Sequence, residues 1–188
     1  MENTWQLPAG NSVPRRLSIP ESKNFSAHRG HEDPIIDALA PLAGYVVFDI
    51  DGTLANIEHR IHFIRDKRKK RYREFFAASV DDKVIEPVRA ILHAIHLQHR
   101  SKIILVSGRS DEVAAETIEW LRTNGIYFDL LYLRRAGNHT PDDELKRQWL
   151  HDFPEREKIW LVIDDRNRVV NMWREEGLTC FQVAPGDF

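Results

Sequence analysis

Residues 45–54 read YVVFDIDGTL, an apolar run that leads directly into two carboxylates and a glycine. The run at 45–50 is rich in β-branched and aromatic residues, and this composition favours a buried strand. Asp49 and Asp51 stand at the end of that strand, two residues apart, and Gly52 follows them. Carboxylate oxygens grouped in this way form a compact oxygen site, which hard cations such as magnesium prefer. The stretch therefore predicts a strand whose end carries a cation site.

Beyond this strand the chain alternates strand and helix patterns. The predicted strands comprise residues 45–50, 102–106, 127–133, 159–163 and 179–183. The predicted helices comprise residues 87–98, 111–122, 140–152 and 167–177. Such alternation implies right-handed βαβ crossovers and a mainly parallel sheet. We therefore expect an α/β fold with a doubly wound, Rossmann-like parallel sheet.

Some of these elements carry further local signals. The helix at 87–98 presents one apolar face, formed by Val88, Ile91, Leu92 and Ile95. In the helix at 140–152, Thr140 precedes Pro141, which is typical of an N-cap followed by proline at the first helical position. Packing roles in the core are expected for Trp120, Trp149, Trp173 and Cys180.

Two segments fall outside the alternation. Residues 1–43 contain five prolines separated by polar residues, and we predict an extended or poorly ordered arm there. The alternative is an arm anchored by Trp5 that binds a partner or clasps an oligomer. Residues 55–86 are too long for an ordinary loop between a strand and a helix. They predict a small helical cap over the carboxyl edge of the sheet, within a domain at 44–188.

Composition excludes several classes of protein. There are 27 Lys and Arg against 29 Asp and Glu, so the net charge of −2 gives no overall attraction to nucleic acid or membranes, and any basic contact surface must be local. The N-terminus lacks a signal pattern, and no apolar run approaches the roughly 20 residues that span a bilayer. A single cysteine suits a reducing compartment. We expect a cytoplasmic protein without a membrane segment, and no pattern indicates an oligomeric state.

Polar clusters follow other predicted strands as well. Ser107-Gly108-Arg109 follows the second strand, and Asp164-Asp165 follows the fourth. Asp142 and Lys146 lie one turn apart on the helix at 140–152. Each cluster alone has an ordinary explanation as a turn, a helix cap or a surface ion pair. Because ligands of open α/β sheets bind at the carboxyl ends of the strands, their joint placement predicts one site that needs a cation to balance its carboxylates.

These motifs, in this order, resemble the four signature motifs of the haloacid dehalogenase superfamily. Within it, DIDGTLA, Arg60, VSGR, Asp142 with Lys146, IDDRNRVVNMWREEG and QVAPGDF resemble the 3′-phosphatase domain of T-even phage polynucleotide kinase. The likeness covers about residues 44–188. It does not extend to a kinase, since the sequence has no phosphate-binding loop of the G-x-x-x-x-G-K-[ST] type. Residues 55–86 depart from the phage enzyme.

The resemblance implies a Mg²⁺-dependent phosphomonoesterase that forms an aspartyl phosphate. Asp49 would be the nucleophile, and Asp51 would protonate the leaving oxygen and then activate water. The implied metal ligands are Asp49, the backbone carbonyl of Asp51, and Asp165, with Asp164 acting behind them or through a water. The implied phosphate-binding residues are Ser107, Gly108, Arg109, Lys146, Arg60 and Thr53; Arg109 and Lys146 also count as catalytic. Asp142 would orient Lys146.

Four functions are compatible with these motifs. The favoured one is a polynucleotide 3′-phosphatase acting on DNA or RNA ends, with a separate polynucleotide kinase or ligase as partner. The basic stretch at 65–73 favours it, because neutralising regularly spaced phosphates releases counterions. The alternatives are a phosphatase of nucleotides or sugar phosphates, a phosphoprotein phosphatase, and a phosphate-binding module without turnover. The intact carboxylate and lysine set argues against the last. A zinc site at His59 and His62 is disfavoured, because no further ligands cluster there.

Overall fold

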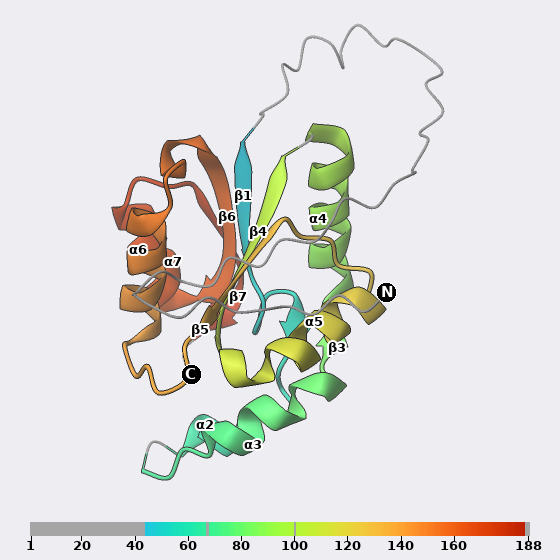
Figure 1. Ribbon diagram of the computed structural model, residues 1–188, viewed down its shortest axis with the longest axis vertical. Coiled ribbons are helices and arrows are strands. Elements are labelled where there is room, and N and C mark those ends of the chain that lie inside the picture. The colour runs from blue at the N-terminus through green and yellow to red at the C-terminus, as the bar shows by residue number, and fades with distance from the viewer. Residues whose placement is uncertain (1–43, 67, 100, 187–188) are drawn as a thin grey trace, which may run out of the picture.

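Five parallel strands form the centre of the molecule (Figure 1). The structure, a computed structural model, describes residues 44–66, 68–99 and 101–186, so the predicted arm at 1–43 lies outside the described residues. All neighbouring strands in the sheet pair in parallel, in the order β5-β4-β1-β6-β7. Their bounds are Tyr45–Asp49 for β1, Lys102–Ser110 for β4, Leu130–Arg134 for β5, Ile159–Arg166 for β6 and Cys180–Gly186 for β7. The predicted α/β class and doubly wound parallel sheet are confirmed.

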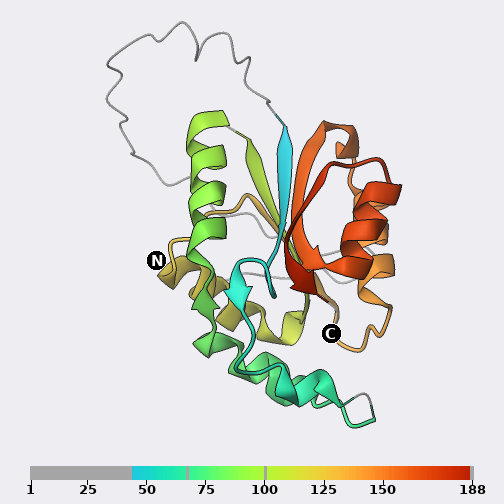
Figure 2. The same cartoon turned by 180° about the vertical axis from the view of Figure 1, so that it is seen from behind.

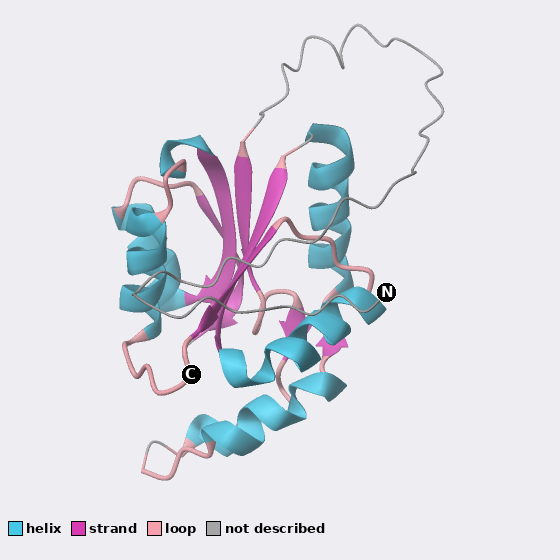
Figure 3. Ribbon diagram, in the orientation of Figure 1, coloured by secondary structure: helices cyan, strands magenta, loops and turns pink. Residues whose placement is uncertain are grey.

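Helices cover both faces of the sheet, as Figure 3 shows. Because side chains alternate along a strand, β1 buries Val46 and Phe48 against one pair of helices and Tyr45 and Val47 against the other. The first pair is α4 (Glu86–His99) and α5 (Ala114–Thr123), and the second is α6 (Asp142–Asp152) and α7 (Asn167–Glu175). All five residues of β1 are buried, as expected for a central strand packed on both faces.

The predicted packing residues lie in the core. Trp120 packs on the α4 and α5 face, and Trp149, Trp173 and Cys180 pack on the α6 and α7 face. Burial raises the pKa of the Cys180 thiol to about 12, so this thiol stays protonated at neutral pH. None of the helices in the described residues combines the length and the apolar character needed to cross a membrane.

Several sequence predictions were wrong in detail. Ile91 is 47% exposed, so the buried face of α4 is narrower than predicted and consists of Val88, Leu92 and Ile95. β5 begins at Leu130 rather than at residue 127. Thr140 caps no helix: α6 begins at Asp142 without a side-chain cap, and the carbonyl of Thr140 instead accepts a hydrogen bond from Arg134.

The start of the predicted helix at 111–122 also differs. Its first turn is a 3₁₀ helix, η2 (Asp111–Val113), and α5 follows from Ala114. The hydroxyl of Ser110 accepts a hydrogen bond from the amide of Glu112, which caps this turn. β4 is longer than predicted and continues to Ser110. The strand therefore carries the whole Ser107-Gly108-Arg109 cluster rather than ending before it.

The segment at 55–86 leaves the sheet and returns to it through a short antiparallel pair. β2 (Ala55–Asn56) pairs with β3 (Lys83–Val84), and two short helices and one 3₁₀ turn lie between them. These elements are α2 (His62–Arg65), α3 (Tyr72–Ala77) and η1 (Ala78–Asp81). Figures 1 and 2 show them beyond the carboxyl ends of the strands, where the small helical cap was predicted.

Candidate active site

The register of the sheet brings the ends of three strands together. Asp49, the last residue of β1, is level with Val106 of β4, and the residue before it is level with Ile163 of β6. Ser107 and Asp164 directly follow these two partners, so they flank Asp49 on either side. The three motifs that the sequence placed after separate strands therefore meet at one edge of the sheet.

A tight turn after β1 shapes this edge. The carbonyl of Ile50 accepts hydrogen bonds from three amides, those of Thr53, Leu54 and Ala55. Gly52 has a φ of 95°, and a Cβ at this position would lie 2.2 Å from a carboxylate oxygen of Asp165. Only glycine combines this conformation with such a close approach. The turn therefore brings the DIDGT motif against the end of β6, where the Thr53 hydroxyl also donates to Asp165 at 3.3 Å.

Three carboxylates gather on one side of β1. Asp49, Asp164 and Asp165 are buried, and a carboxylate oxygen from each lies within 4.8 Å of the others. In the described part of the chain this is the only group of three or more acidic, histidine or cysteine side chains that close. All three offer oxygen ligands, and such a set fits a hard cation such as Mg²⁺.

Lys146 is the cation of this cluster. Its Nζ donates to Oδ1 of Asp49 at 2.6 Å and to Oδ2 of Asp164 at 2.9 Å. Burial alone would lower the pKa of Lys146, but Asp164 and Asp49 outweigh burial and raise it well above its ordinary value. The ammonium group is therefore firmly charged and points directly at the predicted nucleophile.

One lysine does not balance three carboxylates. Burial raises the pKa of Asp49 well above its ordinary value; Lys146 partly offsets this, and the neighbouring carboxylates raise the pKa further. Burial and then the charge of Asp164 likewise raise the pKa of Asp165 to about 7. Three carboxylates beside one lysine leave an excess of negative charge when all are ionised, and this charge adds to burial in raising the two pKa values. A divalent cation bound there would relieve it.

Asp142 lies behind the lysine. Lys146 follows it one turn further along α6. The distance between Oδ2 of Asp142 and Nζ of Lys146 is 3.9 Å, which is too long for a hydrogen bond. Arg134 holds its Oδ1 at 3.0 Å, and Arg166 lies 3.4 Å from its Oδ2. Gly108 makes room for it, because a Cβ there would lie 2.6 Å from Oδ1 of Asp142. Neither Arg134 nor Arg166 was singled out as a site residue from the sequence.

Asp51 lies on the other side of β1, among guanidinium groups. Arg109 donates from Nε and Nη2 to its carboxylate at 2.8–3.1 Å, and Arg60 donates through Nη2. The hydroxyl of Ser107 also donates to Asp51, at 2.9 Å. Burial would raise the pKa of Asp51, but the two arginines outweigh burial and hold it well below the ordinary value. Asp51 is therefore an ionised carboxylate in this structure, and its side chain does not belong to the acidic cluster.

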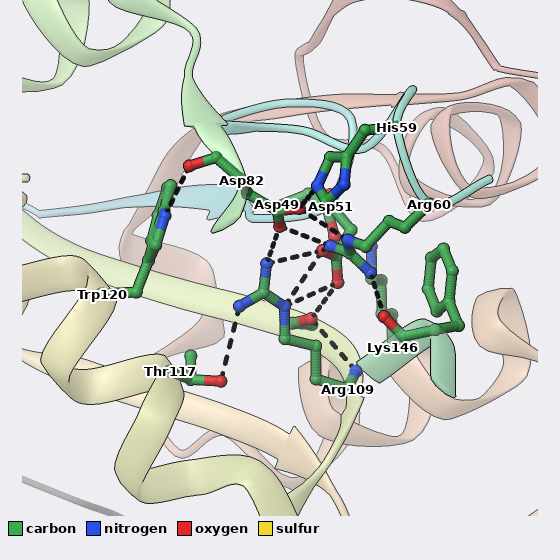
Figure 4. A network of polar contacts seen from close by, with 11 residues as sticks. Asp49, Asp51, His59, Arg60, Asp82, Arg109, Thr117, Trp120 and Lys146 are labelled. Carbon is green, nitrogen blue, oxygen red and sulfur yellow. Dashed lines mark hydrogen bonds and ion pairs between the residues drawn. The ribbon is translucent and has the colours of Figure 1, made fainter. Parts of the chain in front are cut away.

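A further residue, Asp82, completes this half of the site (Figure 4). Its carboxylate accepts hydrogen bonds from Nε and Nη2 of Arg60, both at 2.6 Å, and from Nη2 of Arg109 at 2.8 Å. His59 approaches it at 2.9 Å, and the indole of Trp120 donates to its backbone carbonyl. The side chain is fully buried. Asp82 therefore holds both arginines in line with Asp51.

Sequence reasoning missed Asp82 for a clear reason. It follows Asp81, an identical residue that is exposed, and nothing in the local pattern separates the two.

Arg60 was predicted to contact phosphate, and the structure shows which groups surround its guanidinium. Its guanidinium carbon lies 4.2 Å from the centre of the Phe75 ring, and its Nη1 donates to the carbonyl of Phe75 at 3.3 Å. In the structure Arg60 therefore contacts two carboxylates and one aromatic ring.

The site combines the parts that phosphate-ester chemistry requires. Asp49 offers a carboxylate oxygen beside a fixed lysine, and the adjacent carboxylates can hold a cation. Two guanidinium groups and a hydroxyl gather around Asp51, on the opposite side of β1. Forked, permanently charged donors of this kind match the geometry of a phosphate group. The arrangement can therefore bind a phosphate between the carboxylates of Asp49 and Asp51.

Comparison with known proteins agrees with this geometry. Residues 43–188 match the model of the family described as polynucleotide kinase PNKP phosphatase domain. A chain in the structure of the Pnkp1/Rnl/Hen1 RNA repair complex is 29% identical, with a TM-score of 0.66 over 90% of this chain and 50% of that chain. A second chain, from another structure of the Pnkp1/Rnl/Hen1 complex, is 30% identical, with a TM-score of 0.64 over 88% of this chain and 52% of that chain. The present chain thus spans about half the length of these relatives.

A more distant structure shows the same fold. A haloacid dehalogenase-like hydrolase from Streptococcus pneumoniae has a TM-score of 0.54 at 12% identity, over 75% of this chain and 84% of that chain. Together with the family match, which covers the sheet, the cap and every residue of the site, this likeness leads to one conclusion. The chain belongs to the family of the polynucleotide kinase PNKP phosphatase domain, and it is a phosphatase of the haloacid dehalogenase superfamily.

Proposed function

We propose that this chain is a Mg²⁺-dependent phosphomonoesterase that removes 3′-phosphates from DNA or RNA ends through an aspartyl-phosphate intermediate. The observation that carries the proposal is the setting of Asp49. It is a buried carboxylate at a strand end, held by Lys146 and flanked by Asp164 and Asp165. A carboxylate in that setting could attack phosphorus once a bound cation joined Lys146 in offsetting the negative charge of the carboxylates and of the phosphate.

The acidic cluster fits Mg²⁺ by its chemistry. The donor set is oxygen-only, and burial together with the charge of Asp164 raises the pKa of Asp165. Asp49, Asp165 and the backbone carbonyl of Asp51 would hold the ion, with Asp164 in support. Bound there, Mg²⁺ would supply charge neutralisation between the nucleophile and the phosphate oxygens. Every other part of the reaction falls to side chains of the chain itself.

Two proton-coupled steps follow from the arrangement. The free carboxylate oxygen of Asp49 forms a bond to phosphorus as the bond from phosphorus to the sugar oxygen breaks, and Asp51 gives its proton to that oxygen. Water then attacks the aspartyl phosphate, Asp51 takes the proton, and inorganic phosphate leaves. Lys146, Ser107 and Arg109 hold the phosphoryl oxygens, where negative charge develops.

The first of these steps requires Asp51 to be protonated, whereas the arginines keep it ionised in this structure. A bound phosphate resolves the difference. Its negative charge disfavours a second charge on Asp51, and Arg60 and Arg109 would turn part of their hydrogen bonding to its oxygens. Both effects raise the pKa of Asp51. Binding of substrate therefore prepares the acid that the reaction needs.

The cap supports a polynucleotide as the substrate. Six basic side chains of the cap are exposed, namely Arg65, Arg68, Lys69, Lys70, Arg71 and Arg73. Polynucleotides offer neighbouring phosphates to such a surface, and a mononucleotide does not. The relatives that form an RNA repair complex support the same substrate class, and by the same likeness a kinase or ligase as partner.

The first prediction tests the substrate. The kcat/KM for a 3′-phosphorylated oligonucleotide should exceed that for a 3′-mononucleotide, and the advantage should fall with salt because exposed charges are screened. Replacing Arg68, Lys69 and Lys70 with alanine should raise KM for the oligonucleotide. The matched control replaces Lys102, Arg122 and Lys158, which are exposed and lie on α5 or near the amino ends of β4 and β6.

The control removes the same charge and should leave the oligonucleotide preference intact. If the oligonucleotide and the mononucleotide react equally well at low salt, the substrate is a small molecule instead. A phosphopeptide and a 5′-phosphorylated oligonucleotide belong in the same assay. Faster release from either of them would overturn the 3′-end assignment.

The second prediction separates the two carboxylates of the DIDGT motif. Asp49→Asn should abolish turnover on all substrates, because no aspartyl phosphate can form. Asp51→Asn should reduce kcat on an alkyl phosphate by about 10²- to 10⁴-fold, the usual contribution of general acid–base catalysis. The loss should be smaller on an aryl phosphate, whose leaving group hardly needs a proton. Steady-state kinetics on both substrates would measure this, and equal losses would contradict the role of Asp51.

The third prediction concerns the metal. Activity should vanish in EDTA and return with Mg²⁺, because the acidic cluster is left with an unbalanced negative charge. Asp165→Asn should raise the Mg²⁺ concentration needed for half-maximal activity, whereas Asp152→Asn, an exposed position at the end of α6, should not. Full turnover in excess EDTA would show that the reaction needs no divalent ion.

The fourth prediction tests Asp82 as a positioning residue. Asp82→Asn leaves two buried guanidinium groups with one carboxylate, so it should lower kcat and reduce stability by about 3–5 kcal/mol, the typical cost of breaking a buried pair. Asp81→Asn, at the exposed neighbouring position, should match the wild type in both. Kinetics and thermal unfolding would measure the difference. Wild-type kcat and stability in Asp82→Asn would show that the arginines need no such support.

A further inference from the structure

A series of aromatic rings connects the site to the surface of the cap. The ring of Phe75 lies against the guanidinium of Arg60, at 4.2 Å. Phe75 contacts Phe76 edge to face, with ring centres 5.5 Å apart, and Phe76 stacks on Tyr72 at 6.1 Å and 22°. Consecutive contacts therefore run from the buried side chain of Arg60, through the two phenylalanine rings, to Tyr72 on α3.

Tyr72 ends this series at the surface and among cations. It is 49% exposed. Lys70 lies beside it, with Nζ 5.6 Å from the ring centre and 3.2 Å from the hydroxyl. Lys69, Arg71 and Arg73 are exposed around it. An exposed aromatic ring bracketed by basic side chains is the arrangement on which unpaired bases stack while the backbone phosphates contact the cations.

The cap holds this ring in place. The guanidinium of Arg71 lies 4.6 Å from the centre of the Phe63 ring, and the amide of Arg71 donates to the carbonyl of Phe63 at 2.9 Å. These contacts tie the start of α3 to α2. Tyr72, the first residue of α3, is thereby fixed at its backbone as well as through Phe76. A preorganised ring loses little entropy when a ligand stacks on it.

We propose that Tyr72 is a stacking subsite for an unpaired base of the substrate strand, one or more nucleotides before the 3′-phosphate, with Lys69 and Lys70 contacting the adjoining backbone. The inference rests on the proposed function and adds to it the form of the substrate: a single-stranded end. Inside a duplex the bases stacked above and below cover both faces of each base, so the ring has no free face to contact there. The shared chemistry is a nucleobase on a phosphate backbone, which both DNA and RNA supply.

The experiment measures kcat/KM for a 3′-phosphorylated single strand relative to kcat/KM for an aryl phosphate. Tyr72→Ala should lower this ratio by about 5- to 100-fold, through KM, which matches the contribution of one stacked base. Tyr72→Phe should keep the ratio, because stacking needs the ring and not the hydroxyl. Tyr127→Ala is the matched control. Tyr127 is also exposed, but it lies before the amino end of β5, at the edge of the sheet away from the cap.

Substrates with a single abasic position locate the stacked base. The abasic position is moved along the strand from one substrate to the next. In the wild type, an abasic site at one position, or at either of two neighbouring positions, should lower the ratio to the value measured for Tyr72→Ala. In Tyr72→Ala the same substrates should cause no further loss, because the contact is already absent. A single strand should also react faster than a blunt duplex with the same 3′ end. DNA and RNA strands are both assayed, and this pattern in either one supports the subsite.

The outcomes separate this inference from the function on which it rests. A wild type that prefers the oligonucleotide while Tyr72→Ala keeps the full ratio would overturn the subsite alone. Equal rates on the blunt duplex and the single strand would also overturn it, as would indifference to every abasic position. A wild type without any preference for an oligonucleotide over a mononucleotide would overturn the polynucleotide assignment itself.

Discussion

Four charged side chains, three of them buried and the fourth partly buried, join the cap to the sheet. Arg60 and Asp82 belong to the segment that forms the cap, whereas Asp51 follows β1 and Arg109 lies on β4. The guanidinium groups contact both carboxylates, and Asp82 is fully buried between them. Removing one partner from a buried ion pair leaves an uncompensated charge at a cost of several kcal/mol. The cap and the sheet are therefore held in register by the same side chains that surround the site.

The two halves of the site differ in their charge balance. Around Asp51, two arginines match two carboxylates, and the pKa of Asp51 falls. Around Asp49, one lysine faces three carboxylates, and burial together with the neighbouring carboxylates raises the pKa of Asp49. In a balanced network each charge has an opposite partner, whereas an excess of negative charge is relieved by a proton or by a bound cation. The pKa values of two carboxyl groups only two positions apart are thus shifted in opposite directions.

Much of this site could be predicted from the sequence because a parallel sheet imposes its geometry. Once YVVFD was assigned to a central strand, the residues after each strand had to meet at one edge, as Asp49, Ser107 and Asp164 do. The residues that escaped prediction depend on packing between distant segments. Asp82 and Asp81 look alike in sequence, and only the approach of Arg60 and Arg109 buries the first of them. Tertiary contacts, and not the local pattern, likewise decide which apolar residues of α4 are buried.

The position of Phe75 joins binding to chemistry. Its ring lies on Arg60, its backbone carbonyl accepts from the same guanidinium, and Phe76 and Tyr72 pack outward from it. A ligand on the outer face of the cap would thus contact one end of a row of side chains. The other end of that row is Arg60, which forms an ion pair with Asp51. In the mechanism proposed above, Arg60 shares its hydrogen bonds with the phosphate before Asp51 acts as an acid, so contacts remote from phosphorus would assist the step at phosphorus. On the proposed function, the cap would take part in catalysis as well as in binding, and the row of Phe75, Phe76 and Tyr72 would link the two.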